Sequence, residues 1–477
     1  MRATSKIGTR ILLAITLNTI SPLTAANSEK TLSLDEVLNT SLDHTPQILE
    51  AIEKQRGKIG KQFAADGAFD STFNQSSLFW LSGFYNGTYI DSSVTKPLRS
   101  SGATVYGGYR SGTGTFPIYE DEFITLNRGE LNVGILFPLL RNRNFDEKRY
   151  NLRNSELDVQ LAETDILLTQ IQVQHNAMIA YWRWLAAGAR LSVYQHLLEI
   201  SEERDSAFST LVSEGSLAEI ALIENTQNVL KRRSFVARVQ GELEVAALTL
   251  SLYYRDNLGK PQTPKPSQLP AEFPAVDLNI IRNVDKDINR ALVRQAELNR
   301  IDIVMEQAKL KLRLGENLLK PKVDAGVKFA RDLGDGRESS VGNDIIIELE
   351  ISVPIGARKA RGEIESSKAK FNELLFERQR VEEQLKANIK QLSHLLTASA
   401  ELTNLAKQEV SQAVILEGAE KIREAEGAST FFVLNLREEN TADARVRKII
   451  AQLEYFEEVT NYYAATANTD AFHIDDL

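Results

Sequence analysis

Apolar residues recur at three- and four-residue steps along two long stretches of the chain, residues 154–214 and 363–426. Both stretches are rich in Leu, Ala, Glu, Gln, Lys and Arg, which favour α-helices. Polar residues share the apolar stripes, so we expect each helix to pack beside partner helices without entering a wide core. A helix of about 70 residues is about 105 Å long, too long for one globular domain to enclose. The pattern therefore predicts a coiled-coil-like array of rods lying side by side.

The same landmarks occur twice along the chain in the same order. An alternating apolar segment precedes Pro138 and another precedes Pro354, and a short basic turn follows each proline. A long proline-free run then contains one glycine at a similar place, Gly215 in the first run and Gly427 in the second. Because four kinds of landmark recur in one order, we interpret the chain as an internal duplication of one structural unit.

The two units are expected to be tandem repeats, residues 27–270 and 271–477. Each would contain a leading helix, a strand pair, a long helix, a turn at glycine and a returning helix. The helices are predicted over residues 34–62, 145–214, 216–258, 285–319, 356–426 and 428–465. Laid end to end, a leading and a returning helix match the length of one long helix. The proline-rich stretch 260–270 links the two units.

Residues 323–330 and 344–353 alternate between apolar and polar or charged side chains. This pattern is typical of transmembrane β-barrel strands, although an ordinary half-solvated hairpin would show it too. In the first unit we expect residues 69–84 to pair with 122–137. The stretch between them, 100–110, is either an outer loop or extra strands. Four strands cannot close a barrel, which needs about eight, so we expect two or three chains to supply eight or twelve strands together.

The start of the chain, residues 1–26, is typical of a secretory signal peptide. Basic residues precede an apolar stretch over 11–20, and small residues precede the expected cleavage before Asn27. A short buried helix is the alternative interpretation. The apolar stretch is too short to cross a bilayer, and no later window is both long and uncharged enough to do so. We therefore expect an exported chain whose insertion into a membrane would need a closed β-barrel.

Composition and charge argue against several kinds of chemistry. The chain has no cysteine and a formal net charge of −9, so we expect neither thiolate chemistry nor binding to nucleic acid. Its five histidines lack the spacing of metal ligands, and no phosphate-binding loop or nucleophile elbow is found. Carboxylate pairs such as Glu438 and Glu439 are expected on solvated helix faces. We predict no enzyme activity, no cofactor and no metal.

The duplicated order of strand pair, proline, long helix, glycine turn and returning helix resembles the TolC-like outer-membrane efflux proteins. The likeness covers nearly all of the chain after residue 26. It is carried by residues 137–143 and 353–358 at the strand-to-helix junctions, 214–220 and 426–438 at the helical turns, and 318–324 before the third strand. Some members of the family are anchored through an N-terminal cysteine, which this chain lacks.

The resemblance implies a mixed α+β membrane protein that assembles as a homotrimer. A long α-helical, coiled-coil-like periplasmic barrel would continue a transmembrane β-barrel of twelve strands shared between the protomers. It implies an outer-membrane channel, in contact with lipid, that docks on a periplasmic adaptor (membrane fusion) protein bound to an inner-membrane transporter. Such a channel passes small molecules or proteins outward, in efflux or type I secretion, without an energy source of its own. The alternative is an exported coiled-coil scaffold or adhesin of the cell envelope.

Two groups of site residues follow from the resemblance. The periplasmic tips that meet the adaptor would be Gly215, Ser216 and Leu217 in the first unit, and Gly427, Ala428 and Ser429 in the second. The glycines also have a structural interpretation, since each can end a helix in the left-handed conformation. Many relatives carry acidic residues just after the second tip. Phe431, Phe432 and Asn435 stand there in this chain, which leads to the hypothesis of an apolar constriction at the entrance.

Overall fold

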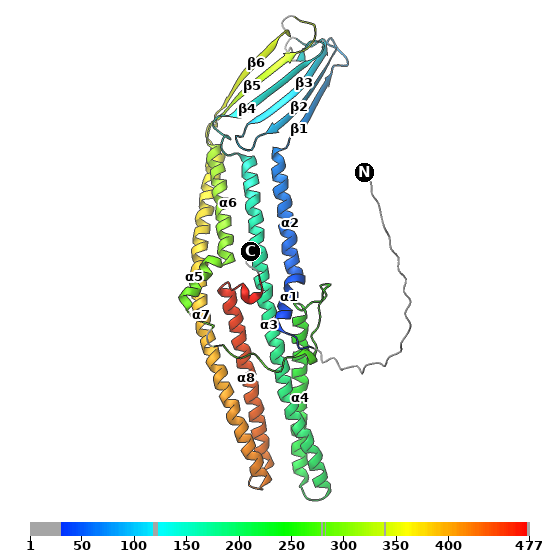
Figure 1. Cartoon of the computed structure of the whole chain (residues 1–477), viewed down its shortest axis with the longest axis vertical. Helices are drawn as coiled ribbons and strands as arrows, with labels where there is room; N and C mark the ends of the chain where they lie inside the picture. Colours follow the sequence, from blue (N-terminus) through cyan, green and yellow to red (C-terminus); the bar gives the residue numbers. More distant parts are fainter. Residues whose placement is uncertain (1–29, 118–122, 278–279, 282, 338–339, 475–477) are drawn as a thin grey trace, which may run out of the picture.

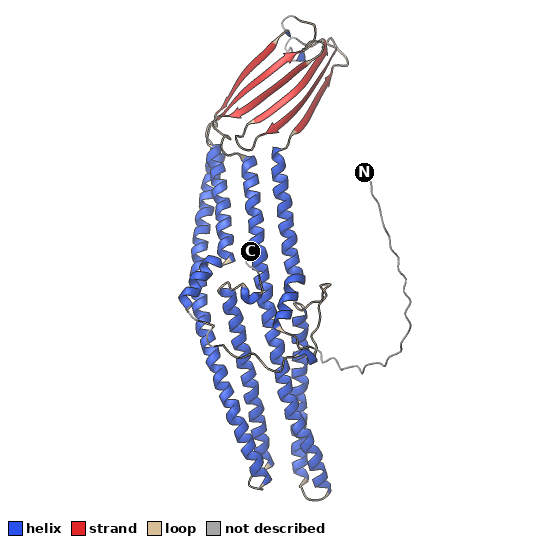
Figure 2. Ribbon diagram, viewed as in Figure 1, coloured by secondary structure: helices blue, strands red, loops and turns tan. Residues whose placement is uncertain are grey.

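A computed structural model describes residues 30–117, 123–277, 280–281, 283–337 and 340–474. The expected signal peptide lies outside these residues. The described chain forms a long bundle of helices with one β-sheet at its end (Figure 1). The strands occupy one end of the long axis and the helices the rest of it (Figure 2), so the predicted mixed α+β class is confirmed.

Two helices run far along the bundle, α3 (Glu147–Ser213) and α7 (Arg358–Ala425). Their bounds lie within two residues of the predicted ones. The helix α3 begins after Asp146, whose carboxylate accepts a hydrogen bond from the backbone N–H of Arg149 at 2.8 Å. Helix-favouring composition and a capped start therefore explain why so long a segment stays helical.

The shorter helices are more broken than predicted. They are α1 (Leu34–His44), α2 (Pro46–Asp66), α4 (Glu219–Ser251), α5 (Val284–Arg294), α6 (Ala296–Leu318) and α8 (Phe431–Ala465). The single helix predicted over 34–62 is interrupted at Thr45, which is extended because Pro46 follows it. The one predicted over 285–319 is interrupted at Gln295, also extended, where neither proline nor glycine stands.

The helices form one layer, four helices wide at each level. Near the sheet the lateral order is α2, α3, α6, α7, and farther away it is α4, α3, α8, α7 (Figure 1). The long helices α3 and α7 thus run through both levels, while a leading and a returning helix share the length beside each of them. This arrangement agrees with the predicted matching of helix lengths.

The sheet has six antiparallel strands in sequence order. They are β1 (Thr72–Phe79), β2 (Gly87–Pro97), β3 (Thr104–Gly114), β4 (Glu130–Pro138), β5 (Lys322–Asp332) and β6 (Asn343–Ser352). The predicted pairing of 69–84 with 122–137 is wrong, because β1 pairs with β2 while β4 pairs with β3 and β5. The stretch 100–110 belongs largely to β3, one of two extra strands. The described part of one chain therefore has six strands where four were expected, so three copies would bring eighteen in place of twelve.

A belt of short segments surrounds the middle of the bundle. It consists of α1, α5, residues 252–277 after α4, and residues 466–474 at the end of the described chain. Beneath it, the α3 side chain Trp184 is fully buried. The Tyr181 hydroxyl donates to the Leu32 carbonyl at 3.0 Å, and the Gln174 amide donates to the carbonyls of Leu38 and Phe472, both at 2.9 Å. The main apolar core thus joins the beginning, middle and end of the chain.

Among the described residues, no helix combines the length and the apolar character that crossing a membrane requires.

Candidate functional site

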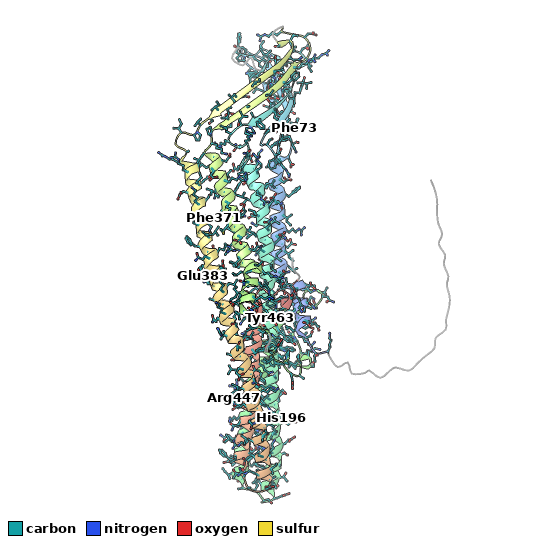
Figure 3. All side chains as sticks on the ribbon, turned by 60° about the vertical axis from the view of Figure 1, so that its left-hand side comes forward. Phe73, His196, Phe371, Glu383, Arg447 and Tyr463 are labelled. Carbon is teal, nitrogen blue, oxygen red and sulfur yellow. The ribbon has the colours of Figure 1, made fainter. Side chains whose placement is uncertain are left out.

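The sheet has one apolar face. On β4, β5 and β6, register brings large apolar side chains together on this face. They are Val133, Ile135, Val327, Phe329, Ile345, Ile347, Leu349 and Ile351, all well exposed in the single chain. On β1 and β2 the same face mixes Phe73 (Figure 3) and Val94 with Gln75 and Ser92. A large exposed apolar surface of this kind marks contact with lipid or another protein.

The opposite, polar face carries a ladder of charges. Glu130 on β4 is only 2% exposed and pairs with Arg110 on β3 and with Lys328 on β5, the latter at 3.2 Å. Farther along, Lys322 pairs with Glu350 on β6 at 2.9 Å. Ion pairs that join neighbouring strands satisfy these charges within the sheet. The two faces of the sheet are therefore built for different surroundings.

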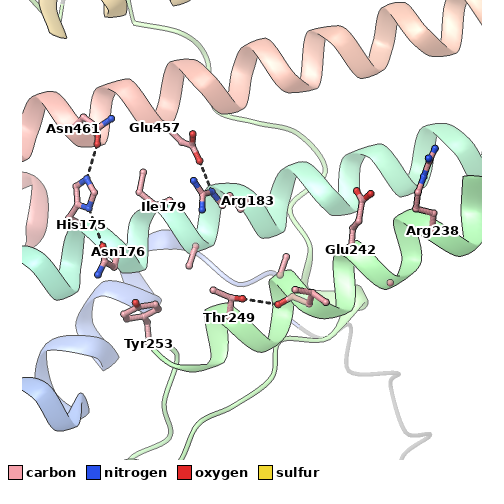
Figure 4. A pocket seen from close by; sticks show the side chains of 14 residues that line it. His175, Asn176, Ile179, Arg183, Arg238, Glu242, Thr249, Tyr253, Glu457 and Asn461 are labelled. Carbon is pink, nitrogen blue, oxygen red and sulfur yellow. Dashed lines mark hydrogen bonds and ion pairs between the residues drawn. The ribbon is translucent and has the colours of Figure 1, made fainter. Parts of the chain in front are cut away.

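A groove of about 990 Å³, lined by apolar as well as charged side chains, runs along α3 between α4 and α8 (Figure 4). His175 Nε2 lies 2.8 Å from Asn461 Oδ1, and the Arg183 guanidinium donates to the Glu457 carboxylate at 2.7 Å. Trp184 of the core is not among the lining residues, whereas Ala180 of the core and Tyr253 of the belt are. The helix α3 thus has one face covered by the belt and another that lines a charged, open groove.

Apolar residues are also exposed along both lateral edges of the helical layer. On one edge they belong to α2 and α4: Leu49, Ile52, Ile59, Phe63, Ile220, Ile223, Leu230 and Leu248. On the other edge they belong to α7: Leu375, Phe376, Leu395, Ile415 and Ile422. The sheet is likewise unpaired at β1 and at β6. The described chain is therefore open on both sides along its whole length.

The predicted tip residues lie in two matching turns at the end of the bundle farthest from the sheet (Figure 1). Gly215 and Gly427 have φ of +73° and +75°. The backbone N–H of Ser216 donates to the Leu211 carbonyl at 2.9 Å, and that of Ala428 donates to the Arg423 carbonyl at 2.8 Å. Both turns are Schellman motifs, in which glycine supplies the left-handed residue. The glycines thus have the structural role, and the exposed residues beside them form the surface of the tips.

The residues of the hypothesised constriction do not share one environment. Phe431 packs against Phe208 of α3, with ring centroids 5.1 Å apart, and lies under the Arg204 guanidinium. Asn435 is buried and accepts a hydrogen bond from Arg232 of α4 at 2.5 Å. Only Phe432 projects outward, with 69% of its surface exposed.

A buried charge cluster near the tips joins three helices, and sequence reasoning missed it. The Arg204 guanidinium forms two hydrogen bonds with the Glu438 carboxylate, at 2.5 and 3.2 Å. Arg232, 1% exposed, donates to the Leu197 carbonyl at 2.8 Å and lies 3.4 Å from Glu438. Burial lowers the pKa of Arg232, and the Glu438 charge opposes that effect. The expectation that Glu438 lies on a solvated face is wrong, because α3 and α4 cover it.

The histidines of the described chain are spread over the bundle. His175 faces Asn461, His196 lies 3.6 Å from Glu199, and His473 lies 3.3 Å from Asp35. Within the described ranges, no three His, Asp or Glu side chains gather closely enough to hold a metal ion.

Solved structures of bacterial channels share this fold. The Campylobacter jejuni CmeC outer membrane channel is 13% identical, with a TM-score of 0.64 over 97% of this chain and 98% of that one. The chain has the fold of the TolC-like outer-membrane channels. The open-state Neisseria gonorrhoeae MtrE outer membrane channel is 12% identical, with a TM-score of 0.64 over 91% and 88% of the two chains. The outer membrane protein VceC from Vibrio cholerae is 15% identical, with a TM-score of 0.61 over 91% and 95%.

No family model matches the sequence, and no curated protein matches it. The resemblance predicted from the landmark order is confirmed at the level of fold by the solved structures.

The substitution Glu438→Gln tests the buried charge cluster. It leaves Arg204 and Arg232 without their carboxylate, and breaking a buried pair in this way costs about 3–5 kcal/mol. We expect faster amide hydrogen exchange in the tip-proximal half of α8. The matched control is Glu439→Gln. Glu439 pairs with the half-exposed Lys231 at 3.0 Å, and the loss of an exposed pair of this kind costs about 0–1 kcal/mol of folding free energy. Equal exchange in the two variants would contradict the assigned role of the cluster.

Proposed function

We propose that the protein is an outer-membrane channel formed by a closed ring of copies, and that the ring is a homotrimer. The observation that carries this proposal is that one chain is open on both sides at every level. Its unpaired strands β1 and β6 run antiparallel to each other, and both edges of its helical layer expose apolar residues. A head-to-tail contact between two different edges closes into a ring when the rotation allows it.

The segregated faces of the sheet support a place in lipid. In a closed ring, the apolar face would meet hydrocarbon and the charge ladder around Glu130 would line water, as in transmembrane β-barrels. The helices would continue the channel away from the membrane for about 100 Å, the length of a 67-residue helix. The groove along α3 would then face the interior. This arrangement places the helical part in the periplasm.

The family resemblance supports partners at the far end. We propose that the tips, Ser216 and Leu217 with Ala428 and Ser429, dock on a periplasmic adaptor bound to an inner-membrane transporter. The channel would pass small molecules or proteins outward in efflux or secretion. We also propose that residues 27–270 and 271–477 are structural repeats. The same order of two leading helices, strands, a long helix and a returning helix in both halves supports this division.

Neighbouring residues of β6 provide the test of membrane insertion. Ile347→Lys places a charge on the apolar face, where it costs about 2–4 kcal/mol in lipid. We expect this variant to leave the outer-membrane fraction and to lose the heat-modifiable oligomer on a denaturing gel. Glu348→Lys puts the same side chain on the polar face and is expected to retain both. A wild-type chain recovered as a soluble monomer, or equal behaviour of the two variants, would contradict the proposal and favour a scaffold.

A bulky side chain at a tip tests adaptor docking. Ser216→Trp leaves both Schellman turns intact but crowds the surface of the tip, so it is expected to abolish complementation of the deleted gene. Survival on a panel of drugs, metals and detergents is the readout. Thr263→Trp, on an exposed position of the belt well away from the tip, is the matched control and should complement. Full complementation by a normally inserted Ser216→Trp protein would argue against docking at the tip.

A further inference from the structure

The two halves of the chain differ most in the number of their strands and in the connections at the end of the sheet away from the helices. The second half has a single hairpin, β5 and β6, whereas the first half has four strands. The connection from β3 to β4 is also longer than the one from β5 to β6. We call residues 115–117 and 123–129 of this connection the inward segment. Its position explains two glycines of the strands.

The inward segment lies on the polar face of the sheet. Gly112 on β3 belongs to this face because it is two residues from Arg110, whose partner is Glu130. A Cβ atom at Gly112 would lie 1.7 Å from the Phe123 carbonyl oxygen. One at Gly87 on β2, also on the polar face, would lie 2.7 Å from the Phe116 ring. The chain therefore crosses directly over the strands on the side where the charges lie.

An aromatic cluster holds the inward segment against the strands. The ring of Phe123 lies 4.7 Å from that of Tyr89 on β2 and 5.6 Å from that of Trp80 after β1. The ring of Phe116 lies 5.2 Å from Trp80 in an edge-to-face arrangement, and Phe116 is buried. Aromatic pairs of this kind stabilise a contact beyond the area they bury.

Hydrogen bonds tie the other end of the inward segment to the second half of the chain. The backbone N–H of Leu126 donates to the Asp332 carboxylate at 3.0 Å, and that of Arg128 donates to the Leu333 carbonyl at 3.0 Å. In return, the N–H of Asp335 donates to the Asn127 side chain at 3.0 Å. The Leu126 side chain is 2% exposed. The inward segment is thus packed and anchored from both halves.

We infer that the inward segment narrows the outer mouth of the channel. The inference rests on the proposed function, because only in a closed ring does the polar face become a lumen. Three copies with six strands each would form a barrel of the size that leaves a wide aqueous channel in porins. Each copy folds one inward segment over that lumen at the end away from the helices. The mouth admits small solutes and holds back large ones, so of the two proposed routes it favours efflux of small molecules over secretion of proteins.

The chain has no cysteine, so a single Ser352→Cys reports access to the lumen. Ser352 is an exposed residue on the polar face, at the end of β6 near the helices. Intact cells are treated with a small charged methanethiosulfonate or with a maleimide carrying a poly(ethylene glycol) chain of a few kilodaltons. We expect the small reagent to label Ser352→Cys quickly and the large reagent to label it slower by orders of magnitude. Thr263→Cys, on an exposed position of the belt, reports any leakage of the large reagent into the periplasm.

Adding Gly112→Val to Ser352→Cys displaces the inward segment. The large reagent should then label Ser352→Cys nearly as fast as the small reagent does. Gly107→Val on the same strand is the matched control, because a Cβ there meets no atom closer than 3.6 Å. If Gly112→Val does not assemble, the double variant Phe116→Ala and Phe123→Ala removes the aromatic cluster instead. Fast labelling by the large reagent without displacement, or no gain after it, would overturn the inference alone. No labelling by the small reagent would overturn the channel as well.

Discussion

A β-strand leaves a row of backbone N–H and C=O groups unpaired on any side where it has no neighbour. This chain leaves two such rows, on β1 and on β6, at opposite edges of one sheet. The edges of the helical layer also lack a neighbour, because α2 and α4 on one edge and α7 on the other expose apolar side chains. In the proposed ring another copy covers these edges, and the proposed lumen and mouth depend on that closure.

Each level of the molecule then has its own means of holding its shape. The sheet uses ion pairs across strands, with Glu130 between Arg110 and Lys328. The middle of the bundle uses the apolar core beneath the belt, where Trp184 is fully buried. Near the tips, where most helix residues are exposed to solvent, the buried carboxylate of Glu438 joins α8 to α3 and α4. Charge is buried where little apolar surface is available, and the cluster is correspondingly sensitive to the loss of one partner.

The long helices could be predicted within two residues because local signals mark them: helix-forming composition inside and glycine at the end. The tips followed from the same glycines. The break at Gln295 could not be predicted, since neither proline nor glycine marks it. The strand β2 was missed, and the stretch of β3 stayed open between a loop and extra strands, because Gly, Ser and Thr dilute the alternation. The burial of Glu438 depends on Arg204 and Arg232, which are far away in sequence, and only the fold brings them together.

Cryo-electron microscopy of the purified full chain in lipid nanodiscs tests ring closure most directly. We expect a closed ring of three copies, with β6 of each copy paired to β1 of the next and eighteen strands in the bilayer. Separate copies with their sheet edges in water, or a ring closed by the helices alone, would contradict it.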